Sequence, residues 1–187
     1  MGWILLITVT VLMLLVIGMY NSLVRLKVRS ENAWADIDVQ LKRRHDLIPN
    51  LLETVKGYAG HEKQTFEDVI TARNRAMSAT TPGSKAEAEG ILAQSLKSLF
   101  ALAEAYPQLR AVESFNQLQG SLNQIEEALQ NARRYYNAVV RDLNTKIQEF
   151  PSNFIANFFG FKTREFFEIA DAAERVLPKV SFEQVSR

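Results

Sequence analysis

The sequence predicts an all-α protein, in which an N-terminal transmembrane helix is followed by an antiparallel bundle of four main long helices and a C-terminal helical extension. The first observation behind this prediction is an uncharged, apolar stretch over residues 3–20. The second is a composition with only eight Gly and five Pro, in which good helix formers predominate. The third is that apolar residues recur at steps of three and four over most of the remaining chain, which is the period of a helix with one buried face.

The apolar stretch from Trp3 to Tyr20 is interrupted only by two threonines and one glycine. A run of about 20 apolar residues spans the hydrocarbon core of a bilayer as a single helix. The stretch lacks the basic start and the small-residue cleavage site of a secretory signal. We therefore expect a permanent transmembrane anchor over residues 1–21 and a helical bundle domain over residues 22–187.

Basic residues lie on one side of this stretch, because Arg25, Lys27 and Arg29 follow it and no Lys or Arg precedes it. The side of a transmembrane helix that is richer in basic residues usually stays in the cytoplasm. The charges predict a single-pass protein with its N-terminus outside and the bulk of the chain in the cytoplasm. The opposite orientation is the alternative.

The first bundle helix is expected to continue from the anchor to about Gly57. Apolar residues at helical steps mark its buried stripe: Trp34, Ile37, Leu41, Ile48, Leu52 and Val55. Pro49 lies inside this helix and removes one backbone donor, so a kink is expected after His45.

A shorter helix is expected from about His61 to Met77, with four inward residues: Phe66, Val69, Ile70 and Met77. A Thr-Thr-Pro-Gly turn at residues 80–83 ends it. Ser84 is the expected N-cap of the third helix, with Glu87 three residues further on, as in a capping box. The inward stripe of the third helix is Leu92, Leu96, Leu99, Ala103 and Tyr106.

The fourth helix has the most regular pattern. Its apolar residues alternate steps of three and four without a break: Phe115, Leu118, Leu122, Ile125, Leu129, Ala132, Tyr136, Val139 and Leu143. This pattern is typical of a coiled-coil seam. We expect the other three helices to cover the seam along its whole length, and the alternative is a seam left free for another protein.

The composition changes after residue 150, because seven of the eleven phenylalanines lie between Phe150 and Phe167. A final helix is expected over about 164–177. An up-and-down bundle brings this region back to the anchor. Three residues are therefore candidates for contact with the membrane interface: Phe154, Phe158 and Phe159. The alternative is that the phenylalanine rings cap the core of the bundle.

Several short runs resemble the LemA family of bacterial membrane proteins. They are LKRRHDLIPNL at 41–51, GYAGHE at 57–62, AYPQL at 105–109, NARRYYN at 131–137 and PKV at 178–180. They occur in the family's order and extend over nearly the whole chain. The resemblance implies one N-terminal transmembrane helix in the bacterial inner membrane and a helical bundle in the cytoplasm. It implies no established enzymatic activity.

Residue patterns for a catalytic, cofactor or metal site are absent from the sequence. The two histidines, His45 and His61, lie far apart and there is no cysteine, so a zinc site is not expected. The glycines lack the spacing of a phosphate-binding loop. The net charge of +1 gives no general attraction to nucleic acid. We expect a protein that is not an enzyme and has no cofactor and no nucleic-acid partner.

Two arginines fall on apolar stripes, because Arg44 continues the stripe of the first helix and Arg73 lies among the inward residues of the second. A buried guanidinium needs a carboxylate partner, although either arginine could reach solvent on its aliphatic stem. We expect a structural polar network rather than a ligand site. The candidate carboxylate partners are Asp46, Glu62, Glu113 and Glu126.

These observations favour a membrane-anchored scaffold or adaptor that self-associates or presents a surface to other membrane proteins. The expected partners are membrane lipids around the anchor, other membrane proteins and further copies of the chain, since confinement to a membrane raises the effective concentration of identical chains. The alternative is a membrane-bound signalling or sensor module that couples through the long first helix. Sensing from outside is not expected, because only two residues precede the apolar stretch.

Overall fold

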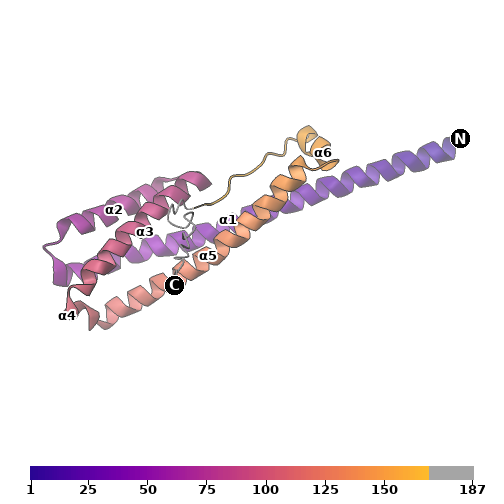
Figure 1. Cartoon of the computed structure of the whole chain (residues 1–187). Coiled ribbons are helices and arrows are strands. Elements are labelled where there is room, and N and C mark those ends of the chain that lie inside the picture. The colour runs from indigo at the N-terminus through magenta and orange to yellow at the C-terminus, as the bar shows by residue number, and fades with distance from the viewer. Residues whose placement is uncertain (169–187) are drawn as a thin grey trace, which may run out of the picture.

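The computed structural model describes residues 1–168, and within them the chain forms helices joined by turns and one extended segment. The helices are α1 (Gly2–Ala59), α2 (Lys63–Ser78), α3 (Pro82–Glu104), α4 (Pro107–Arg110), α5 (Glu113–Gln148) and α6 (Ser152–Phe158). In Figure 1, α1 extends through the whole molecule, α5 lies antiparallel beside it, and α2 and α3 form a hairpin at the end far from the N-terminus. The predicted all-α fold is confirmed.

α1 joins the apolar stretch directly to the bundle. Its side chains as far as Gly18 are all exposed, and α1 is the one helix in the described residues that is long and apolar enough to cross a membrane. From Leu23 onward the helix buries one stripe of side chains. Pro49 does not end the helix, which continues to Ala59, two residues beyond the expected end.

The far half of the bundle has a continuous apolar core built from α1, α2, α3, α4 and α5. One buried residue from each helix illustrates it: Ile48, Val69, Leu99, Leu109 and Phe115. The inward positions of α2 differ from those expected, because Ile70 and Met77 are exposed while Ala72 and Ala76 are buried. The buried face of α2 follows helical steps from Phe66, and these steps pass through small alanines rather than through the larger apolar residues.

The N-terminus of α3 also differs from the expectation. Thr81, not Ser84, is the N-cap, since Thr81 Oγ1 accepts a hydrogen bond from the Ser84 amide at 3.2 Å and Ser84 Oγ accepts one from the Thr81 amide at 3.1 Å. Pro82 fits in the first turn, where its missing N–H has no helical acceptor to lose. Glu87 takes no part in this cap and instead accepts a hydrogen bond from Arg75 at 2.6 Å.

In the near half of the bundle, beside the apolar end of α1, the helices α1 and α5 run along the whole length within residues 1–168 (Figure 1), and α3 reaches the core there at Ala86. The expected seam of α5 faces α1, and α3 meets α5 only in part, for example where the Phe100 and Phe115 rings lie 6.3 Å apart, so the expectation of three covering helices along its whole length was wrong. Two further elements close the near half. One is α6, whose Ala156 is buried against α1 and α5, and the other is the extended chain after α6, which we call the return segment (residues 161–168).

The return segment begins where α6 ends. Gly160 has a φ of 71°, in the left-handed region that favours glycine, and it turns the chain back along the bundle. The helix expected over 164–177 is therefore wrong for residues 164–168, which are extended. The rest of that expected helix lies outside the described residues.

Candidate functional site

A cluster of charged side chains lies buried between the two halves of the bundle. Arg44 and His45 of α1 and Glu89 of α3 are all buried, and Glu89 is 0% exposed. Arg44 Nη1 lies 3.4 Å from Glu89 Oε2 and 3.2 Å from Glu126 Oε2 of α5. His45 Nε2 lies 2.6 Å from Glu89 Oε1. We call these four residues the charged cluster; it connects α1, α3 and α5.

The charged cluster acts as a set of cross-links between helices. Each oxygen of the Glu89 carboxylate has its own partner on α1, so α3 is fixed against α1 in one register. Glu126 is partly exposed, so the Arg44 guanidinium bridges a buried acid and an acid that meets solvent. Such a network adds little net stability over apolar packing, but the removal of one member leaves a buried charge unpaired.

Arg73 has a different role, which follows from Pro49. Proline has no N–H, so the carbonyl of the residue four positions earlier, His45, loses its helical donor. Arg73 Nε donates a hydrogen bond to that carbonyl oxygen at 2.8 Å. The guanidinium of α2 thus supplies the donor that Pro49 removes from α1, and this explains how a proline is accommodated inside this helix.

The structure brings together only some of the residues expected in the polar network. Arg44 and Glu126 are paired. The other candidate acids lie elsewhere: Asp46 is exposed, Glu62 precedes α2, and Glu113 accepts a hydrogen bond from Gln117 at 3.1 Å. The sequence reasoning missed Glu89, although a step of three residues back from Leu92 extends the stripe of α3 to it.

The return segment is held by two asparagines of α5, Asn137 and Asn144, which we call the amide clasp. Asn144 Nδ2 donates to the carbonyl of Arg164 at 2.9 Å, and Asn144 Oδ1 accepts from the amide of the same residue at 2.8 Å. Asn137 forms the same pair with the carbonyl and amide of Phe167, at 3.1 and 2.9 Å. The asparagines are seven residues apart and share one helix face, so they replace the hydrogen bonds of a neighbouring strand.

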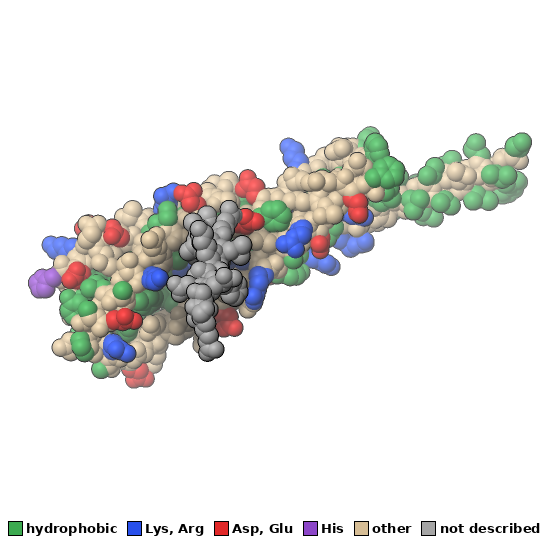
Figure 2. Space-filling model, in the orientation of Figure 1, with side chains coloured by type: hydrophobic (Ala, Val, Ile, Leu, Met, Phe, Trp, Pro, Cys, Tyr) green, Lys and Arg blue, Asp and Glu red, His purple; other side chains and the backbone are tan. Residues whose placement is uncertain are grey.

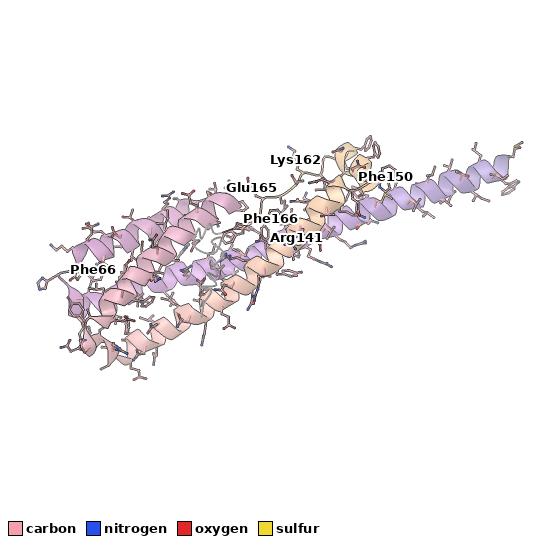
Figure 3. The ribbon with its side chains drawn as sticks, viewed as in Figure 1. Phe66, Arg141, Phe150, Lys162, Glu165 and Phe166 are labelled. Carbon is pink, nitrogen blue, oxygen red and sulfur yellow. The ribbon has the colours of Figure 1, made fainter. Side chains whose placement is uncertain are left out.

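Aromatic packing completes this attachment. The Phe167 ring is fully buried and lies 5.7 Å from the Trp34 ring, which is 5.2 Å from the Tyr136 ring. The Tyr136 hydroxyl donates to the carbonyl of Glu165 at 2.9 Å. Burial raises the pKa of Tyr136 above 10.0, opposed by the charge of Arg164 and assisted by that of Glu165. The hydroxyl therefore stays protonated and can donate this hydrogen bond. Figure 3 labels Glu165 and Phe166 on this segment.

Four phenylalanines are exposed around α6, and we call them the aromatic tip. Their exposed fractions are 76% for Phe150, 64% for Phe154, 83% for Phe158 and 50% for Phe159. These rings do not cap the core, because small side chains, Ser152 and Ala156, take the buried positions of α6. The tip lies against α1, since the Tyr20 and Phe159 ring centres are 4.7 Å apart. In Figure 2 its green side chains adjoin the apolar end of α1.

Metal chemistry receives no support from the described part of the chain. Over residues 1–168, no three His, Asp or Glu side chains are grouped so that they could hold a metal ion. The buried charges instead connect helices, and the buried amides connect a helix to the return segment.

Comparisons with known proteins give a family and distant relatives. The model of the LemA family matches residues 33–182, which include the charged cluster, the amide clasp and the aromatic tip. Magnetosome protein MamQ 2 of Paramagnetospirillum magneticum is 24% identical over 181 residues, covering 83% of this chain and 66% of that protein. MamQ of Magnetospirillum gryphiswaldense is 22% identical over the same length. Protein LemA of Metamycoplasma hominis is 24% identical over 174 residues, covering 91% of this chain and 78% of that protein. The chain spans 66% of the length of the magnetosome relatives.

Proposed function

The chain belongs to the LemA family, and from this membership and the structure we propose that it is a membrane-anchored helical scaffold without catalysis of its own. The bundle presents its surface to copies of itself and to other proteins of the same membrane. One observation carries the proposal: α1 is a single helix whose first part is apolar and exposed and whose remainder is the core helix of the bundle.

The exposed part of α1 is the basis of the anchor. It is uncharged and apolar over residues 3–18, and every residue of this stretch is exposed. A helix that is apolar all round and has no packing partner is stable in lipid, where its backbone hydrogen bonds are satisfied internally. Arg25, Lys27 and Arg29 follow directly and favour a bundle on the cytoplasmic side of the bacterial inner membrane.

The polar residues inside the bundle support a structural role. Both oxygens of Glu89 are engaged by α1, and Arg73 is engaged by the His45 carbonyl. Groups that already satisfy one another fix the helices in place and offer no free acid or base to a substrate. A rigid head on a membrane anchor is suited to holding partners at a defined distance from the bilayer.

Two measurements test the proposal. The chain has no cysteine, so Tyr58→Cys at the exposed end of α1 gives a single thiol. A membrane-impermeant maleimide should label it only after the cells are opened, and labelling of intact cells would contradict the orientation.

Bismaleimide cross-linking of Val39→Cys, on an exposed face of α1, should give dimers in native membranes. Monomer alone, from Val39→Cys and from matched thiols on α3 and α5, would contradict self-association.

The uninterrupted course of α1 favours a second candidate, a module that transmits a change along this helix. Coupling would require that a change in the anchor alters the bundle. Insertion of one alanine after Gly18 should then change hydrogen exchange at the charged cluster, whereas a passive scaffold should show no change there.

A further inference from the structure

We propose that the aromatic tip is a second membrane contact: its rings lie among the headgroups of the leaflet that α1 enters, and the groove beside it takes anionic phospholipid. The inference rests on the anchoring by α1 proposed above. It adds a defined face of the bundle that meets the lipid surface, and therefore a fixed orientation of the bundle on the membrane.

The level of the tip along α1 follows from Tyr20. This residue ends the apolar stretch, so it lies at the boundary between hydrocarbon and headgroups when the stretch fills the bilayer. Its ring centre lies 4.7 Å from that of Phe159 and 5.9 Å from that of Phe161. Direct packing therefore places the tip at the depth where aromatic side chains concentrate in membrane proteins.

The rings of the tip form a continuous apolar surface. Phe150 and Phe154 have ring centres 6.0 Å apart, and those of Phe158 and Phe159 are 5.0 Å apart. Soluble surfaces rarely keep several large apolar side chains together in water, because their exposure is unfavourable. In Figure 2 green side chains at this end of the bundle adjoin the apolar helix, and Figure 3 labels Phe150 next to α6. Lipid surrounds that helix in the membrane, so lipid is also present at the depth of the tip and can cover its rings.

A groove of about 550 Å³ separates the start of the return segment from α1. Its lining combines apolar and basic side chains: Tyr20, Val24, Phe159, Phe161, Lys27 and Lys162. The two lysines form no ion pair within residues 1–168, whereas Arg164 in the same groove is paired with Glu31 at 2.6 Å. Free ammonium groups over an apolar floor match a phospholipid, whose phosphate meets the charge while its chain meets the rings.

The absence of cysteine allows one spin label to report the depth of the tip in the full-length protein. Asn157→Cys carries the label, because Asn157 is exposed in α6 and its replacement leaves every ring in place. The labelled protein is reconstituted in vesicles of phosphatidylcholine with and without phosphatidylglycerol. Collisions with oxygen, which enters lipid, are compared with collisions with a nickel chelate, which stays in water. Leu12→Cys reports the anchor, and Tyr58→Cys reports the far end of the bundle.

The proposal expects an oxygen-to-nickel collision ratio at residue 157 that is several-fold higher than at residue 58 and lower than at residue 12. Phosphatidylglycerol should raise it further, and Lys27→Gln with Lys162→Gln should abolish that increase. Phe154→Ser with Phe158→Ser should lower the ratio several-fold, while Phe166→Ser, on the return segment, should leave it unchanged.

Three results would overturn the proposal. A ratio at residue 157 equal to that at residue 58 would place the tip in water. Few collisions with either reagent, together with spin–spin broadening, would show that a second copy covers the tip. A collision ratio that does not change when phosphatidylglycerol is added would show that the groove does not bind anionic lipid. A water-like label at residue 12 is a different result, because it would refute the anchor itself.

Discussion

The two halves of the bundle close their cores in different ways. The far half surrounds its core with the helices α1 to α5, and the interior is aliphatic and continuous. Along the near half run two long helices, α1 and α5, and their smaller cores are completed by Ala86 of α3, by α6 and by the return segment. Two helices cannot enclose a core, because each leaves an open side, so a third element must cover the seam.

The return segment is extended, unlike the helices around it, and this changes the interactions that hold it in place. A helix satisfies its own backbone, but an extended chain beside a helix must find partners for each amide and carbonyl. The amide clasp supplies them at residues 164 and 167, and Phe167 supplies the apolar attachment. The charged cluster lies between the two cores, since Leu41 before it in α1 belongs to the near core and Ile48 after it belongs to the far core.

The largest effect is expected at this boundary. Arg44→Ala leaves the fully buried Glu89 without its guanidinium partner, so the free energy of unfolding should fall by about 3 to 5 kcal/mol. For a chain of this size that corresponds to a thermal midpoint roughly 10 °C lower, measured on the full-length protein in detergent. The neighbouring Arg43→Ala, at an exposed position, should change it little. Arg44→Met combined with Glu89→Leu should recover most of the loss, and a failure to recover would show that the ion pair itself is required.

Phe167→Ala should destabilise the near half of the bundle and leave the far half stable. Loss of this fully buried ring should cost about 3 kcal/mol, and the cost should fall on the near half because the ring packs on Trp34. Hydrogen exchange should become faster in α1 and α5 around Trp34 and Tyr136 while the far core keeps its protection. Phe166→Ala, one residue away and 36% exposed, is the matched control. Uniform loss of protection would show that the halves unfold as one unit.

The amide clasp should give a smaller and more local effect. Asn144→Ala removes two hydrogen bonds to the backbone of residue 164, and the expected cost is about 1 to 3 kcal/mol. Exchange of the Arg164 amide proton, which Asn144 Oδ1 accepts, should accelerate. Asn123→Ala, at an exposed position of α5, should leave this amide unaffected. Unchanged exchange at Arg164 would contradict the clasp.

The smallest effect is expected at Tyr136, and it depends on pH. Tyr136→Phe removes one hydrogen bond to Glu165, at a cost of about 1 kcal/mol. Because burial raises the pKa of Tyr136 above 10.0, its contribution is fully present below pH 10.0 and is lost as the pH rises through the folded-state pKa. Thermal midpoints measured from neutral to strongly alkaline pH should therefore fall less steeply for Tyr136→Phe than for the parent protein.

The far half could be predicted from the sequence because its stabilising pattern is periodic. The stripes of α1 and α3, and the position of Arg44 on the first of them, follow from counting steps of three and four. Glu89 was within reach of the same rule, since it continues the stripe of Leu92 and Leu96. Periodicity identifies a buried position whatever residue occupies it, and a charged residue at such a position indicates a partner at another.

The near half could not be predicted in this way. An extended segment held by Asn137 and Asn144 has no period of its own, and a helix was expected over 164–177, where residues 164–168 are extended. The interaction of Arg73 was also hidden, because its acceptor is a backbone carbonyl made available by Pro49. Side-chain contacts to backbone groups depend on which atoms other residues leave unsatisfied, and that information is not local in sequence.

The continuity of α1 also determines the direction in which the bundle faces. A flexible linker would let the head swivel, but a single helix from Gly2 to Ala59 ties the rotation of the bundle to that of the anchor. Each residue added between them would turn the head by about 100° and lift it by about 1.5 Å. With α1 as the anchor that we propose, the number of residues between Tyr20 and Leu23 therefore sets the rotation of the bundle about the axis of α1, and with it the side of the bundle that faces a given direction in the membrane plane.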